Sequence, residues 1–137
     1  MIEVIEKNII NDFSLFSSWE EKYEYIISLG RELPPLKKIY KSEKTLIKGC
    51  QSKVWLACEY KDRKLYFFGD SDGLITGGIV ALVIKLYTKS NPQEIIKNDM
   101  TFFSKIGLDE HLSMTRANGL HAMLKVIKNY ALKYEKK

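Results

Sequence analysis

The sequence predicts an α+β domain in which a small antiparallel β-sheet packs against several helices. Residues 53–60 alternate between two faces, with apolar side chains such as Val54 and Leu56 on one of them, which is the pattern of a half-buried strand. A second run rich in aromatic residues, 64–69, follows a short polar turn and completes a hairpin. Residues 73–87 are apolar nearly all round, which predicts a central buried helix. Helices gathered on one face of a small sheet are an α+β architecture.

Two amphipathic helices are expected ahead of this hairpin. Four isoleucines within residues 2–11 share one helical face and predict the first helix. Ser18 begins the second helix, because Glu21 follows three residues later in a capping-box pattern. Gly30 is expected to end that helix.

An irregular segment should connect these helices to the hairpin. Pro34 and Pro35 cannot continue a helix, so we expect the chain to run extended to Lys48. The segment carries several lysines and leads directly to Cys50. Loops of this length are often functional, and the function here would be to hold or move Cys50.

The helix over 73–87 has two notable features. Asp72 is a good N-cap for it. Gly77 and Gly78 lie within it, and each costs about 1 kcal/mol relative to alanine. The close approach of another backbone is the expected reason for these glycines.

The remaining chain is expected to be helical. Asn91 and Pro92 begin a short helix that ends near residue 98, and another is expected over 101–106. Ser113 or Thr115 caps the last helix, whose apolar face is formed by Leu120, Leu124, Ile127 and Ala131.

Length and composition fit one domain covering residues 1–137. The net charge of +5 is modest and shows no basic stripe of the kind that nucleic-acid binding needs, although it suits an acidic protein partner. The longest apolar run, 77–84, is too short for a membrane span, which takes about 20 residues. The N-terminus lacks the pattern of a signal peptide, so we expect a cytoplasmic protein whose thiols stay reduced.

Cys50 is the main candidate for chemistry. Gly49 before it favours a tight turn that presents the next side chain, and the strand behind it anchors the loop. Lys48 and Lys53 flank the cysteine, and nearby positive charge favours the reactive thiolate. From these residues alone, a reactive thiol and an ordinary exposed cysteine in a basic loop are both open.

The other candidate residues have simpler interpretations. Cys58 shares a strand face with apolar residues, so we expect it to pack in the core. Its separation of eight residues from Cys50 does not match the paired-cysteine spacing of zinc sites, and we expect no metal site. His111 or His121 could pair with Cys50 as a base, although histidines in such positions are more often surface or capping residues.

Three separated motifs resemble the SufE/CsdE family, the sulfur acceptors of cysteine desulfurases. They occur in the same order and spacing, which is far stronger evidence than one short pattern. The motifs are Gly49-Cys50-Gln51-Ser52-Lys53-Val54-Trp55, then Gly69-Asp70-Ser71-Asp72 before an apolar helix, then the block from Gly107-Leu108 through His111-Leu112-Ser113 to Arg116, Asn118-Gly119-Leu120 and Ala122-Met123.

The resemblance implies a SufE/IscU-like fold, shared with IscU-type iron–sulfur scaffolds, and a role for each matching residue. Cys50 would be the catalytic thiol that carries a persulfide. Arg116 would stabilise the negative charge of a thiolate or persulfide. The other matching residues would support the loop or contact a partner; they are Gly49, Gln51, Ser52, Asp72 and His111.

The resemblance also implies partners. A SufS-type cysteine desulfurase would donate sulfur, and a SufBCD-type scaffold would receive it for iron–sulfur cluster assembly. The chain would be a desulfurase activator that needs no cofactor of its own, because the desulfurase carries pyridoxal phosphate; whether it forms a homodimer is left open. We expect the free protein to tuck Cys50 toward an apolar cavity and to swing it out on docking.

Three alternative functions are kept beside this one. The chain could be a non-catalytic module that only binds and activates a desulfurase, so that it would not be a sulfurtransferase. It could be an iron–sulfur scaffold, although that needs several thiolate ligands at one site. A thiol peroxidase is the weakest alternative.

Overall fold

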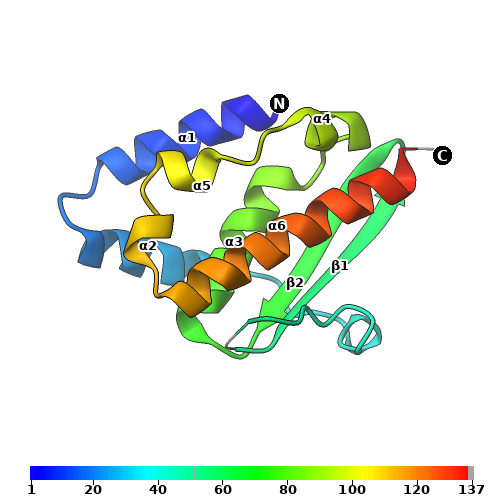
Figure 1. The fold of residues 1–137 in the computed structure, drawn as a ribbon, viewed down its shortest axis with the longest axis horizontal. Helices are drawn as coiled ribbons and strands as arrows, with labels where there is room; N and C mark the ends of the chain where they lie inside the picture. The colour runs from blue at the N-terminus through cyan, green and yellow to red at the C-terminus, as the bar shows by residue number, and fades with distance from the viewer. Residues whose placement is uncertain (51, 136–137) are drawn as a thin grey trace.

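A β-hairpin forms one side of the fold, and the helix that follows it runs through the centre (Figure 1). Strands β1 (Val54–Lys61) and β2 (Lys64–Ser71) pair antiparallel over their whole length. The two turn residues, Asp62 and Arg63, both have positive φ, the turn geometry that matches the natural twist of a hairpin. The predicted hairpin is confirmed, and β2 extends two residues further than expected.

The computed structural model describes residues 1–50 and 52–135, which contain six α-helices. Within this described part, none of the helices is both long and apolar enough to cross a membrane. The helices are α1 (Ile2–Ser14), α2 (Trp19–Arg31), α3 (Leu74–Tyr87), α4 (Pro92–Lys97), α5 (Phe102–Lys105) and α6 (Met114–Tyr134).

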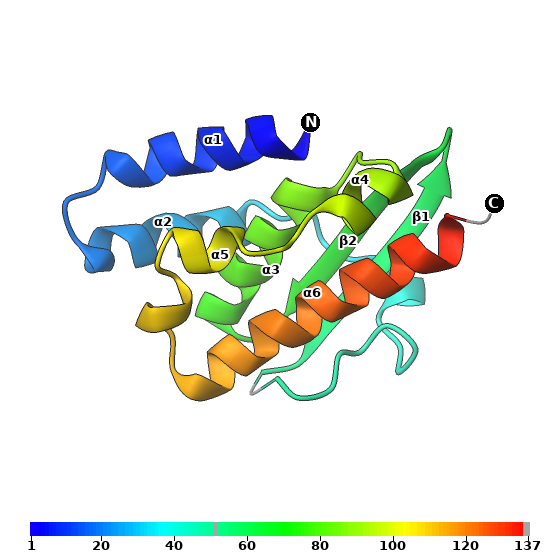
Figure 2. The same ribbon diagram turned by 45° about the horizontal axis from the view of Figure 1, so that its top comes forward.

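Helix α3 holds the domain together. It packs against β2 on one side and against α2 on the other, and nearly every residue of its second half is buried. Helix α6 runs alongside β1 and also contacts α3 and α4 (Figures 1 and 2). The side chains of Tyr87, Phe102 and Phe103 are the largest in the core between these elements. The α+β class predicted from the sequence is confirmed.

Two glycines allow α2 and α3 to cross at close range. A Cβ atom added to Gly30 would lie 2.7 Å from the backbone nitrogen of Gly78, and one added to Gly78 would overlap the backbone of Ile26. The expected backbone approach is therefore confirmed at Gly78, whereas Gly77 has open space around it. The prediction that Gly30 ends α2 is wrong, because α2 continues to Arg31. The lack of a side chain at Gly30 instead lets the backbone of α3 approach α2.

The predicted capping residues at two helices are confirmed. The Ser18 side chain accepts a hydrogen bond from the Glu21 backbone N–H, 3.3 Å away. At the start of α6 it is Ser113, and not Thr115, that caps, accepting from the Arg116 backbone N–H at 3.2 Å. These bonds satisfy N–H groups that a helix leaves without internal partners.

The segment between α2 and β1 is irregular, as expected, apart from a short 3₁₀ helix (Lys38–Tyr40). Its end nevertheless pairs with β1. The Ile47 backbone N–H donates to the Val54 carbonyl at 2.8 Å, and the Leu56 N–H donates to the Thr45 carbonyl at 2.9 Å. These bonds fix the approach of the chain to Cys50 along the outer edge of β1.

Candidate functional site around Cys50

The loop that carries Cys50 lies next to the first half of α6 (Figures 1 and 2). The Cys50 Sγ atom is 3.9 Å from the carbonyl oxygen of Gly119, and the side chain is half-buried against the hydrophobic core. Gly49 has a φ of 92°, a backbone conformation that side chains disfavour. The predicted tight turn before the cysteine is therefore present.

Gly119 provides the space in which the thiol rests. This glycine is buried inside α6, and a Cβ atom there would lie 3.2 Å from Cys50 Sγ, closer than ordinary contact allows. Sequence reasoning placed Gly119 within a motif without giving it a role. The available signal was a glycine inside a helix, which costs about 1 kcal/mol unless something needs the room.

A second glycine receives the other side of the loop. Gly73 is the N-cap of α3, and a Cβ atom there would lie 2.8 Å from the Cβ atom of Ser52. Cys50 and Ser52 are thus seated against glycines of two different helices. Gln51, which was expected to support the loop, lies outside the described residues.

Asp72 ties the loop to the hairpin. Its carboxylate oxygen Oδ1 accepts a hydrogen bond from the Lys53 backbone N–H at 2.8 Å, and its own N–H donates to the Lys53 carbonyl at 3.2 Å. The prediction that Asp72 caps α3 is wrong, because Gly73 occupies the N-cap and has no capping side chain. Asp72 instead pairs with Lys53 just beyond the end of the β-hairpin. These two hydrogen bonds fix the chain where it leaves the Cys50 loop.

The surroundings of Cys50 favour the protonated thiol. Burial raises the pKa of the Cys50 thiol above its ordinary value. Lys48 and Lys53 are both exposed, so their ammonium groups remain hydrated. The prediction that these two lysines favour the thiolate is therefore wrong for this conformation, in which burial of the sulfur raises the pKa of the thiol.

Arg116 lies three residues before Gly119, on the same side of α6 as the thiol. It is half-buried, and among the described residues its guanidinium group forms no ion pair. This placement would allow the guanidinium to reach a charged sulfur on the loop. Its role as a charge stabiliser stays a prediction.

The structure does not bring either histidine to Cys50. The His111 ring stacks on Trp19 with a centroid distance of 3.8 Å, and its Nδ1 atom lies 2.8 Å from the Gly107 carbonyl oxygen. The His111 carbonyl in turn accepts a hydrogen bond from the Tyr23 hydroxyl. His121 is exposed, with Nε2 3.9 Å from the Asp109 carboxylate. His111 therefore positions the turn before α6.

Cys58 lies in the middle of β1 and packs partly against the core, as expected. Burial raises the pKa of its thiol to about 12, so it carries almost no thiolate at neutral pH. In residues 1–50 and 52–135 no group of three or more His, Cys, Asp or Glu side chains could hold a metal ion.

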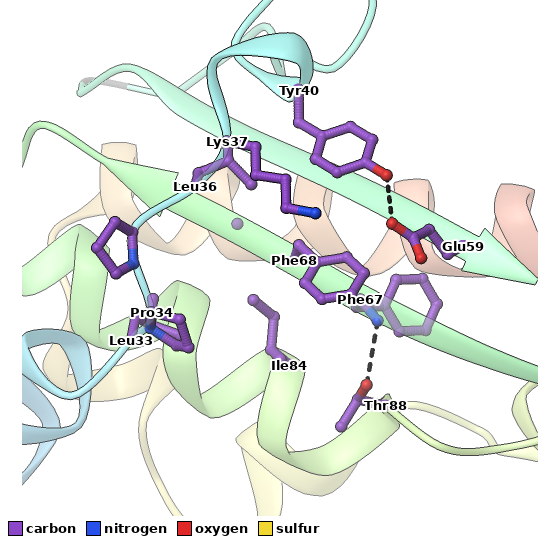
Figure 3. Close-up of a pocket in the computed structure, with 12 residues that line it drawn as sticks. Leu33, Pro34, Leu36, Lys37, Tyr40, Glu59, Phe67, Phe68, Ile84 and Thr88 are labelled. Carbon is purple, nitrogen blue, oxygen red and sulfur yellow. Dashed lines mark hydrogen bonds between the residues drawn. The ribbon is translucent and has the colours of Figure 1, made fainter.

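A separate cavity of about 390 Å³ lies between β2 and the segment 33–40 (Figure 3). Apolar side chains such as Leu36, Phe68 and Ile84 line it, and Tyr40 above it donates a hydrogen bond to Glu59. Cys50 is not among its lining residues. The thiol is therefore sheltered by the gap at Gly119 and the adjoining core, and not by this cavity.

Three comparisons relate the chain to known proteins. The sequence model of the family described as "SufE: Fe-S metabolism associated domain" matches residues 7–131. An uncharacterized SufE-like protein of Rhizobium meliloti (strain 1021) is 40% identical over 128 residues, which cover 90% of this chain and 91% of that protein. The solution structure of a hypothetical protein from Thermus thermophilus superposes with a TM-score of 0.81 over 97% of each chain at 16% identity, which shows a likeness of fold alone.

Proposed function

Because the chain belongs to the SufE family, whose domain is associated with iron–sulfur metabolism, we propose that it accepts a sulfur atom on Cys50 from a cysteine desulfurase. The observation that carries the proposal is the position of the thiol. Cys50 follows a glycine turn on a surface loop, and its sulfur rests in a gap that Gly119 leaves open. Such a thiol can be sheltered at rest and still reach another macromolecule.

The transfer is a displacement between sulfur atoms. The Cys50 thiolate attacks the terminal sulfur of a persulfide on the desulfurase, a new S–S bond forms on Cys50, and the old S–S bond breaks. The electron pair of the broken bond leaves on the desulfurase cysteine as a thiolate, so no oxidant or reductant is consumed. The rate depends on the thiolate fraction of Cys50 and on access to its sulfur.

The raised pKa of Cys50 gives docking a chemical role. In the free protein, burial raises the pKa of the Cys50 thiol and so favours its protonated form, which is the form less readily oxidised. Moving the sulfur away from Gly119 would return it to water, near Lys48 and Lys53, and lower its pKa. Docking would then activate the thiol at the moment when a donor persulfide is present.

The proposed product is a persulfide on Cys50 that a SufBCD-type scaffold consumes for cluster assembly. Removing sulfur from the desulfurase would also speed its turnover. The chain itself would need no cofactor for this chemistry, because the pyridoxal phosphate that releases sulfur from cysteine belongs to the desulfurase. The displacement requires one reactive thiol, and burial raises the pKa of Cys58 to about 12, which makes it the less suitable of the two.

A turnover assay tests the proposal. Alanine release from cysteine by a SufS-type desulfurase is measured with the wild-type chain, with Cys50→Ser and with Cys58→Ala as the matched control. We expect wild type and Cys58→Ala to stimulate the desulfurase and Cys50→Ser to give no stimulation. Full stimulation by Cys50→Ser would show a binding module that activates the desulfurase without taking its sulfur.

A further inference from the structure

The positive charge of the chain is concentrated in the segment that leads to Cys50 and follows it. Residues 37–53 contain six of the 22 basic residues but only one of the 17 acidic residues, Glu43, so their net charge is +5. The rest of the chain is left with 16 basic and 16 acidic residues, which cancel. The whole net charge of +5 therefore resides in the segment that delivers and follows the cysteine. We call its lysines the basic surface: Lys37, Lys38, Lys41, Lys44, Lys48 and Lys53.

All six side chains of the basic surface are exposed. Their segment runs beside β1 and ends near the start of α6 (Figure 2). Along the sequence, Lys48 and Lys53 flank Cys50. The segment is also held in place, because Thr45 and Ile47 bond to β1 and Lys53 bonds to Asp72. The segment is thus anchored to the hairpin on both sides of the cysteine loop.

Within the described part of the chain, only one member of the basic surface has an acidic partner. Lys41 Nζ lies 2.9 Å from Asp70 Oδ2 and 5.1 Å from the centre of the Trp55 ring. The other five lysines form no ion pair there. Their charge remains available to a partner, whereas Lys41 fastens the segment to the end of the hairpin.

We propose that the basic surface is a docking surface for an acidic protein, namely an acidic patch around the persulfide cysteine of the desulfurase. This inference rests on the proposed function, because the sulfur donor must reach Cys50, and the segment that carries these lysines also carries that thiol. Opposite charges on two proteins steer their encounter and raise the association rate, and exposed pairs at the rim add little to affinity itself.

The residue types favour a protein over a nucleic acid. The surface contains no arginine, the residue that most often binds phosphates and bases through its two-pronged geometry. Its neighbouring aromatic rings are not free to stack on bases. Tyr40 stacks on Phe68, and Trp55 is covered by Lys41. Separate, hydrated ammonium groups are suited to long-range steering.

The test is the association rate with a SufS-type desulfurase, measured by stopped-flow mixing at low and at high salt. The double variant Lys44→Glu/Lys48→Glu is compared with Lys97→Glu/Lys125→Glu, which makes the same change in net charge at exposed lysines of α4 and α6. We expect the first variant to associate at least about tenfold more slowly at low salt and to lose most of the salt dependence. The control should remain near wild type in both respects.

Two outcomes would overturn the inference. One is an equal effect of the two double variants, which would show that only overall charge matters. The other is an unchanged desulfurase association rate of Lys44→Glu/Lys48→Glu. Loss of binding to a duplex DNA or RNA probe by that same variant would then assign the surface to nucleic acid. Sulfur loading of Cys50 is followed in the same samples by mass. Normal docking without sulfur on Cys50 would refute the proposed function alone, and normal loading by both double variants at equal rates would refute the docking surface alone.

Discussion

The Sγ atom of Cys50 lies 3.9 Å from the carbonyl oxygen of Gly119, 69 residues further along the chain, where a side chain at position 119 would crowd the thiol. A glycine inside a helix destabilises that helix relative to alanine. Because Gly119 lies where the thiol rests, we attribute the presence of this unfavourable residue to the space that the sulfur needs. The shelter of the cysteine is therefore a property of α6 as much as of the loop.

Gly119→Ala should make Cys50 more reactive. A Cβ atom 3.2 Å from the sulfur would shift the loop toward solvent, and we expect alkylation by iodoacetamide to accelerate several-fold, up to roughly tenfold for about 1.4 kcal/mol of lost shelter. Gly77→Ala is the matched control, because it adds the same methyl group to a helix where nothing lies within 4 Å. Equal alkylation rates in the two variants would contradict the role given to Gly119.

The neighbouring glycines of α3 should respond oppositely to the same substitution. Gly78→Ala forces a methyl group into the backbone of Ile26 and should lower the free energy of unfolding by about 1–3 kcal/mol. Gly77→Ala meets open space and should raise it by up to about 1 kcal/mol. Urea denaturation followed by circular dichroism measures both, and a destabilised Gly77→Ala would show that the α2–α3 crossing is wrongly described.

Asp72→Ala should loosen the exit of the cysteine loop. The Lys53 N–H would lose its carboxylate acceptor, at a cost of about 1 kcal/mol, so exchange of that amide should accelerate roughly fivefold. Hydrogen exchange followed by NMR measures the effect. Asp72→Asn keeps an acceptor oxygen and should exchange nearly as slowly as wild type, and rapid exchange in both variants would argue against this hydrogen bond.

The reactivity of Cys50 should rise at a higher pH than that of an unstructured cysteine. Burial raises its pKa, so alkylation of Cys58→Ala, in which Cys50 is the remaining thiol, should reach half its maximum above the value for a cysteine peptide, about 8.5. The folded thiol holds its proton more tightly than the unfolded thiol does. The contribution of the Cys50 thiol to the free energy of unfolding is therefore complete below the pKa of the unfolded state. It is lost as the pH rises through the pKa of the folded state. A midpoint below that of the peptide would mean that Lys48 and Lys53 dominate after all.

Local patterns predicted most of the fold, and long-range contacts account for what they missed. The hairpin, the Ser18 and Ser113 caps and the buried face of α6 all depend on residues close together in sequence. The roles of Gly30 and Asp72 depend on which distant backbone lies opposite, at Gly78 and at Lys53 respectively. A glycine near the end of a helix looks the same in sequence whether it stops the helix or makes room for a neighbouring backbone. An aspartate before a helix likewise looks the same whether it caps the helix or bonds to a distant residue.

The candidate site divides in the same way. The glycine turn before Cys50 was evident in the sequence, and so was the motif around it. The raised pKa of the Cys50 thiol could not be inferred from its neighbours in sequence, because the groups that exclude water from it lie on α6 and in the core. The expectation of no basic stripe is wrong, because residues 37–53 carry the whole net charge of +5 on exposed lysines. The charge could be counted in the sequence, but the exposure of each lysine required the structure.

The most direct test of the account is the intact mass of the protein after brief mixing with a SufS-type desulfurase and cysteine, followed by peptide mapping without reductant. The account predicts the added mass of one sulfur atom on the peptide that contains Cys50, in wild type and in Cys58→Ala, and no added sulfur in Cys50→Ser. Sulfur on Cys58, or an unchanged mass of the wild-type chain while the desulfurase turns over, would contradict it.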